Sequence, residues 1–92
     1  MTLQPGCVRG FEQDCGVMLF SMMDGAKEVA CAVSSSAMDD LERGPRAKPD
    51  QRKEQFLRLR SRIEQCVSRK FYAGEFEGAP PGIILRSMDF RT

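Results

Sequence analysis

The chain has 92 residues, with 14 basic and 13 acidic side chains and a net charge of +1. A chain of this length forms one small domain, residues 1–92, and the near balance of charge argues against general coating of polyanions. Histidine is absent, which removes histidine-activated nucleophiles, the commonest general base and most zinc, copper and non-haem iron sites.

The sequence has no apolar stretch near the ~18–20 residues that a transmembrane helix needs. Its N-terminus also lacks the apolar core of a signal peptide. We therefore expect a cytoplasmic protein that does not contact a membrane. In that reducing compartment, Cys7, Cys15, Cys31 and Cys66 are predicted to be free thiols.

Residues 1–15 contain no regular hydrophobic period. Pro5, Gly6 and Gly10 interrupt this stretch, and both residue types weaken helices and strands. We therefore expect an irregular N-terminal lead-in, which Phe11 anchors to the rest of the chain.

Residues 16–33 predict a β-hairpin. The apolar run VMLFSMM is too short for a confident helix and suits a well-covered strand, and KEVACAV after it alternates in polarity. Asp24-Gly25 between these runs favours a type I′ turn, which needs positive φ at its two central residues. The two strands are therefore expected to pair antiparallel.

Residues 34–43 predict a short helix. Any one of Ser34, Ser35 and Ser36 can accept a hydrogen bond from an early helical N–H, which is how such serines cap a helix. Gly44-Pro45 ends the helix and opens a linker that runs to residue 50.

Residues 49–74 predict a long amphipathic helix that begins at Pro49-Asp50 and ends at Gly74. Its apolar stripe is made of Phe56, Leu59, Ile63, Cys66, Val67 and Phe71. The opposite side is basic and carries Arg58, Arg62 and Arg69. Arg52 and Arg60 fall on the apolar side, where their side chains must reach past its edge.

Residues 82–90 predict the last strand, after a turn-rich segment. The order of elements is strand, strand, helix, helix, strand. We therefore predict an α+β fold, in which a three-stranded antiparallel sheet is covered on one face by the long amphipathic helix and the short helix. The sequence does not indicate which strand of the hairpin pairs with the last strand.

Several of these residues form a pattern that resembles a known family. The pattern contains Phe20, Asp24-Gly25, Val29-x-Cys31-x-Val33-Ser34, Ala37, Leu41, Phe56, Ile63, Val67, Lys70-Phe71-Tyr72 and the segment from Gly82 to Asp89. It resembles the small bacterial family labelled domain of unknown function 1488, over about residues 16 to 90. The resemblance implies a stand-alone bacterial α+β domain. It implies no reaction, because the family has none assigned.

The arginine row on the long helix is the sharpest functional feature of the sequence. Arg58, Arg62 and Arg69 can contact phosphates or an acidic protein surface. The alternative interpretation is a solvated helix face, partly neutralised by Glu54 and Glu64. No aromatic residue lies on that side to stack on bases, which weakens a role in binding single strands.

We therefore expect a small non-catalytic interaction or regulatory protein, with no catalytic residue, cofactor or metal site. The alternative is a nucleic-acid-associated protein that uses the arginine row. An enzyme of unusual chemistry would need carboxylates such as Asp39, Asp40 and Asp89 gathered in one cleft. We also expect an unidentified protein partner, and a weak or moderate homodimer that forms through a strand edge or the uncovered sheet face.

Overall fold

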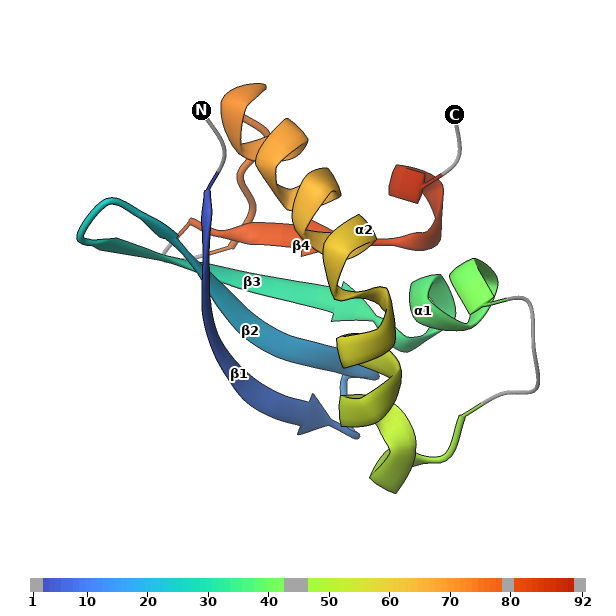
Figure 1. The fold of residues 1–92 in the computed structure, drawn as a ribbon. Coiled ribbons are helices and arrows are strands. Elements are labelled where there is room, and N and C mark those ends of the chain that lie inside the picture. Colours follow the sequence, from blue (N-terminus) through green and yellow to red (C-terminus); the bar gives the residue numbers. More distant parts are fainter. Residues whose placement is uncertain (1–2, 43–46, 79–80, 91–92) are drawn as a thin grey trace.

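The structure is a computed structural model that describes residues 3–42, 47–78 and 81–90. A sheet and a long helix dominate it (Figure 1), which confirms the α+β class. In chain order the elements are β1 (Gln4–Glu12), β2 (Val17–Asp24), β3 (Lys27–Ser34), α1 (Ser35–Glu42), the 3-10 helix η1 (Pro49–Gln51), α2 (Arg52–Tyr72), β4 (Ile83–Leu85) and the 3-10 helix η2 (Ser87–Phe90).

The sheet has four strands in the order β1-β2-β3-β4. β2 pairs antiparallel with both β1 and β3, whereas β4 pairs parallel with β3. The prediction of a three-stranded antiparallel sheet is therefore wrong in both respects. The parallel pair follows from the connection, because α1 and α2 together form the long crossover that two parallel strands require.

The additional strand is β1, in the stretch for which the sequence predicts an irregular lead-in. Its pairing with β2 shifts register twice, between Pro5 and Val8 and again between Val8 and Gly10. Such bulges move successive side chains out of strict alternation, so the period of two is not visible in the sequence. Pro5 and Gly10 are tolerated because β1 is an edge strand. Phe11 packs against the core, as expected.

The last strand is shorter than the predicted range 82–90. β4 ends at Leu85, and the chain then forms η2. Asp89 causes this turn: its Oδ2 accepts a hydrogen bond from the backbone N–H of Arg86 at 2.7 Å, and its own N–H donates to the Arg86 carbonyl at 2.9 Å. A local bond of this kind competes with the strand ladder and ends it.

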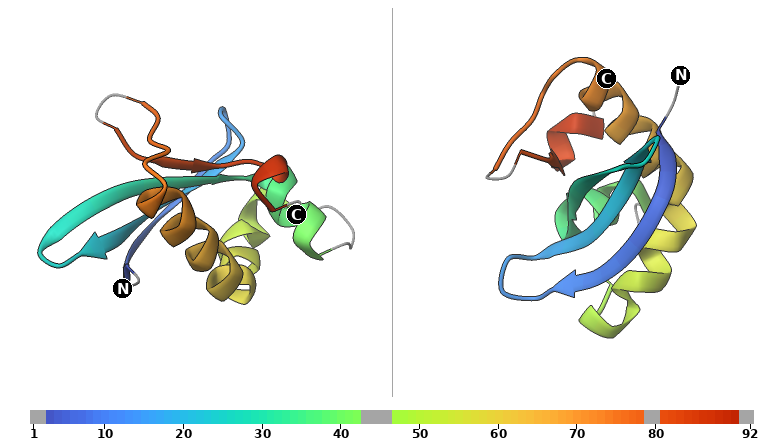
Figure 2. Two further views of the ribbon diagram at one scale, coloured as in Figure 1. Left: turned by 90° about the horizontal axis from the view of Figure 1, so that it is seen from above. Right: turned by 90° about the vertical axis from the view of Figure 1, so that its left-hand side faces the viewer.

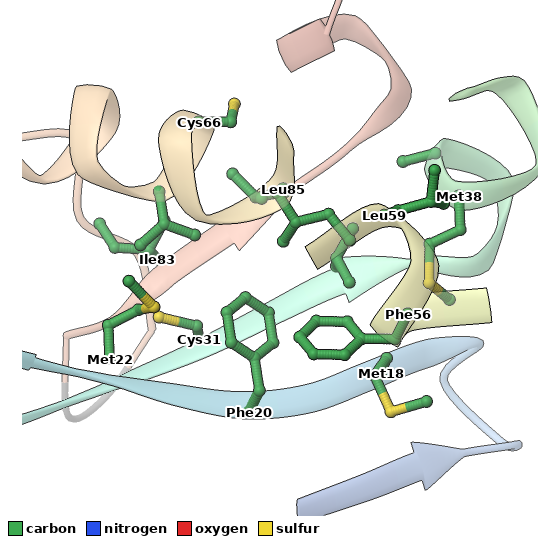
Figure 3. Close-up of a cluster of buried hydrophobic side chains, with 14 of the residues drawn as sticks. Met18, Phe20, Met22, Cys31, Met38, Phe56, Leu59, Cys66, Ile83 and Leu85 are labelled. Carbon is green, nitrogen blue, oxygen red and sulfur yellow. The ribbon is translucent and has the colours of Figure 1, made fainter. Parts of the chain in front are cut away.

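The core lies between α2 and one face of the sheet (Figures 2 and 3). The rings of Phe20 from β2 and Phe56 from α2 meet there, with their centroids 4.8 Å apart. The other buried apolar residues around this pair are Leu3, Met18, Met22, Val29, Cys31, Val33, Ala37, Met38, Leu59, Ile63, Cys66, Val67, Ile83 and Leu85. The predicted stripe of the long helix thus faces the sheet.

Local signals position the ends of these elements. The loop of the hairpin is Gly25-Ala26, one residue later than the predicted turn, because Asp24 still pairs with Lys27. Ser34 caps α1, since its Oγ accepts a hydrogen bond from the N–H of Ala37 at 3.0 Å. Gly74 has a φ of 74° and follows α2, a conformation that favours glycine after the end of a helix.

Candidate functional site

A cavity of about 340 Å³ lies between α2 and η2. It is lined by Arg62, Gln65, Cys66, Arg69, Asp89 and Phe90. Two of the three arginines of the predicted row, Arg62 and Arg69, therefore lie at one concave site. The volume is at the lower end of the range for small-ligand sites, about 300 to 1,000 Å³, so the cavity can hold a side chain or a chain terminus of a partner.

Basic residues of α2 hold η2 in place and so form this cavity. Lys70 is buried, and its Nζ lies 2.9 Å from the carbonyl oxygen of Ile84 and 3.2 Å from Oδ1 of Asp89. Arg69 donates from Nη2 to the backbone carbonyl of Asp89 at 2.5 Å. Both basic residues come from the last two turns of α2, where cations are also favoured by the helix dipole.

The charges around the cavity do not cancel. Arg62, Arg69 and Lys70 contribute three positive charges, and Asp89 contributes one negative charge that Lys70 already contacts. Arg62 is exposed and has no hydrogen-bond or ion-pair partner within the described parts of the chain. Counted over the described residues, the site therefore has an excess of two positive charges and one unengaged guanidinium group.

Cys66 forms part of the cavity wall at the margin of the core cluster (Figure 3). Its Sγ lies 3.3 Å from Nη2 of Arg69 and 3.5 Å from the Asp89 carbonyl oxygen. Burial raises the pKa of the Cys66 thiol, and the nearby Arg69 offsets this only in part. The group is therefore a neutral thiol near neutral pH, and it does not have the lowered pKa of an activated nucleophile.

Arg58, the third arginine of the predicted row, is engaged elsewhere. It contacts Glu42 of α1 through two hydrogen bonds, 2.8 Å from Nε to Oε2 and 3.1 Å from Nη2 to Oε1. These bonds lower the pKa of Glu42 below its usual value. Arg58 thus joins the two helices, and the row of three arginines is reduced to the pair at the cavity.

A second polar cluster, which the sequence did not reveal, lies between the start of α2 and α1. Arg52 is only 3% exposed, and its Nη1 lies 2.7 Å from both Oδ1 of Asp39 and Oε1 of Gln55. Gln55 is fully buried and donates to Asp39 at 2.9 Å and to Glu42 at 3.0 Å. The expected exposure of Arg52 past the edge of the stripe is therefore wrong. The signal that could have found this cluster is a pair of polar residues, Arg52 and Gln55, one turn apart beside the apolar stripe.

The carboxylates that an unusual enzyme would need are not gathered in one place. Asp39 contacts Arg52 and Gln55, whereas Asp89 contacts Lys70. Gln55 and Lys70 are 15 positions apart on α2, which corresponds to about 22 Å of helix. Among the residues that the structure describes, no three His, Cys, Asp or Glu side chains are placed to share a metal ion.

The fold is that of a small α+β domain, with a cavity that two arginines line. Residues 5–84 match the model of the family described as "Protein of unknown function (DUF1488)". The chain belongs to this family, and the expectation from the sequence pattern is confirmed. The family assigns no activity.

A solved structure agrees with this assignment. The chain resembles the crystal structure of a protein of unknown function from the DUF1488 family of Shewanella loihica PV-4, with a TM-score of 0.72 and 13% identity. The match covers 90% of this chain and 94% of that one. At this identity the likeness shows the fold alone. A search of curated proteins found no significant match.

None of the helices in the described ranges combines the length and the hydrophobicity that crossing a bilayer requires. The longest, α2, has 21 residues and carries charged side chains along most of its length.

Proposed function

We propose that this protein acts by binding and not by catalysis, and that the cavity between α2 and η2 receives an acidic group of a protein partner. The observation that carries this proposal is the pair Arg62 and Arg69 at one cavity, with Arg62 unengaged among the described residues. A guanidinium group presents several N–H donors in one plane and binds carboxylates through two of them.

The rest of the cavity supports a single acidic side chain or a chain terminus as the bound group. Gln65 adds a neutral polar side chain at the rim, and Phe90 adds an apolar surface that packs against the core. Apolar walls around a few polar groups are typical of sites that fix one orientation of a bound group. Asp89 lies beside the arginines and disfavours a dense array of negative charges.

A protein partner fits these observations better than a nucleic acid. Binding along a phosphate backbone uses several cations in a row, and Arg58 is withdrawn from the row by Glu42. The nucleic-acid role is therefore the alternative outcome of the experiment below. Unlike binding of one carboxylate, contact with many phosphates weakens steeply as the salt concentration rises.

The experiment compares the wild-type protein with two charge reversals on α2. Arg62→Glu alters the cavity, whereas Lys53→Glu makes the same change at an exposed position near the other end of the helix. Each tagged protein is used to capture partners from its host, and the captured proteins are quantified by mass spectrometry. Titrations with a short peptide that carries a single glutamate and with a short oligonucleotide are followed by NMR of the arginine side chains.

We expect Arg62→Glu to reduce capture of specific proteins about tenfold or more, because it removes a charge-assisted contact and adds a repulsive charge. Lys53→Glu should leave the same proteins bound. Identical captured sets for all three proteins would overturn the proposal. Oligonucleotide binding that is lost between about 50 and 200 mM salt would replace it by the nucleic-acid role.

The expected cytoplasmic location stays a prediction. Cys7 and Cys15 are exposed, and all four cysteines are free thiols. Exposed thiols persist in reducing compartments, which supports this location.

A further inference from the structure

The face of the sheet opposite α2, called the open face here, carries no helix among the described residues. Because side chains alternate along a strand, the burial of Met18, Phe20 and Met22 against α2 directs their neighbours away from it. The apolar members of the open face are Val17, Leu19, Met23, Ala30, Ala32 and Ile84. Ala30 is exposed and the others are half-buried.

We propose that a second copy of this chain covers the open face, so that two sheets pack face to face. The small side chains of Ala30 and Ala32 allow the close approach of another sheet, since stacked sheets lie about 10 Å apart. A two-fold pairing uses the same patch on both copies and closes without leaving a further copy of the patch exposed. This proposal concerns a surface separate from the cavity between α2 and η2.

The edges of the sheet are poorly suited to pairing, which leaves the open face as the surface for association. At the β1 edge, Pro5 has no N–H, and two register shifts twist the strand. At the other edge, β4 has only three residues, and the carbonyl of Ile84 already accepts a hydrogen bond from Lys70 at 2.9 Å. Neither edge offers a long flat row of free backbone groups.

The charged side chains of the open face are compatible with packing against an identical face. Nη2 of Arg9 on β1 lies 2.8 Å from Oε1 of Glu28 on β3, and the pair crosses β2 on this face. The pair carries no net charge. Within the paired residues of the described strands, the register places one further charged side chain on this face, Glu12 at the end of β1. Two such faces therefore meet with little repulsion, and each supplies both a cation and an anion to the other. A strongly acidic or basic partner finds no matching excess here.

The size of the open face sets the strength of the dimer. Four strands about 4.8 Å apart and eight residues long at about 3.4 Å each give a face of about 500 Å², an upper value because β4 is short. Two such faces bury at most about 1,000 Å² in total, which is at the lower limit for a specific interface. We therefore expect a weak dimer that depends on protein concentration.

Sedimentation equilibrium from about 10 μM to about 1 mM, the range of weak association, tests the proposal. The wild-type protein is compared with Ala30→Glu and Arg9→Glu on the open face, and with Leu57→Glu as a control. Leu57 is 47% exposed on α2 and outside the open face. Circular dichroism and thermal melts establish whether each variant is folded. If Ala30→Glu does not fold, Arg9→Glu alone tests the open face.

We expect the wild type and Leu57→Glu to dimerise with the same dissociation constant. The two open-face variants should raise that constant about tenfold or more, because each adds negative charge to the packed face of both copies. A wild-type mass that stays monomeric at the highest concentration would overturn the proposal. So would a dimer that both open-face variants leave unchanged. Arg62→Glu should not affect the dimer, which separates this test from that of the cavity.

Discussion

Arg52 and Asp39 form a charged contact of 2.7 Å between α2 and α1, although 13 positions separate them in the chain. The guanidinium group is almost completely buried, and Gln55 and the ring of Phe11 complete its surroundings, the ring centroid lying 5.6 Å from Cζ. One buried cation thus ties the start of α2 to α1 and faces the end of β1. This contact fixes the start of α2 against α1, whereas the C-terminal half of α2 lines the cavity together with η2.

Replacing Asp39 should destabilise the protein strongly. Asp39→Ala leaves the charge of Arg52 buried without its carboxylate, and we expect a loss of about 3 kcal/mol, the lower end for a broken buried pair because Asp39 is partly exposed. Urea melts measure the free energy of unfolding. Asp40→Ala, one position further along α1 at an exposed site, is the control and should change it by less than about 0.5 kcal/mol. Equal effects of the two changes would show that the pair does not stabilise the fold.

The same carboxylate predicts a loss of stability in acid. Burial raises the pKa of Asp39, but hydrogen bonds from Arg52 and Gln55 outweigh it and leave the pKa below its ordinary value. A group with a lowered folded pKa stabilises the protein above its unfolded pKa of about 4, and that contribution is lost as the pH falls through the folded pKa. Melts at several pH values should therefore show the difference between wild type and Asp39→Asn shrinking below about pH 4. A difference that stays constant down to pH 2 would contradict the assignment.

Truncating a side chain at the centre of the apolar stripe should lower the free energy of unfolding more than truncating one on the exposed side of the same helix. Ile63 is fully buried against the sheet, whereas Leu57 is 47% exposed on the same helix. We expect Ile63→Ala to lower the free energy of unfolding by about 2–5 kcal/mol. Leu57→Ala should stay within about 0.5 kcal/mol, as surface changes do. Denaturant melts of both variants measure these changes. A small change in the free energy of unfolding for Ile63→Ala would show that the stripe does not face the core.

The four thiols should separate into two classes of reactivity. Cys7 and Cys15 are exposed, while Cys31 and Cys66 are buried. Burial raises the pKa of Cys31 to about 12 and that of Cys66 above its usual value, and only the thiolate reacts. Alkylation near neutral pH should therefore modify two cysteines promptly and the other two only after unfolding, as mass spectrometry can show. Prompt labelling of Cys31, or an internal disulfide under reducing conditions, would contradict this.

The sequence by itself determined the elements whose signals are local. The apolar stripe through Phe56 and Ile63 predicted α2 and the side it buries, because a helix repeats its contacts every three to four residues. The hairpin of β2 and β3 followed from two apolar runs around a glycine turn. Arg62 and Arg69 were also identified as candidate contact residues, from their position on the polar side of that helix.

The tertiary structure alone decided the features that depend on distant partners. β1 is a strand because β2 supplies its ladder, and its bulges hide the alternation that sequence reading requires. β4 is parallel to β3 because the two helices between them carry the chain back across the sheet. Arg58 and Arg52 differ in role from Arg62 only because Glu42 and Asp39 of α1 lie opposite them. A charged side chain becomes part of the core or part of a site according to the partner that packing places beside it, and packing is a property of the whole chain.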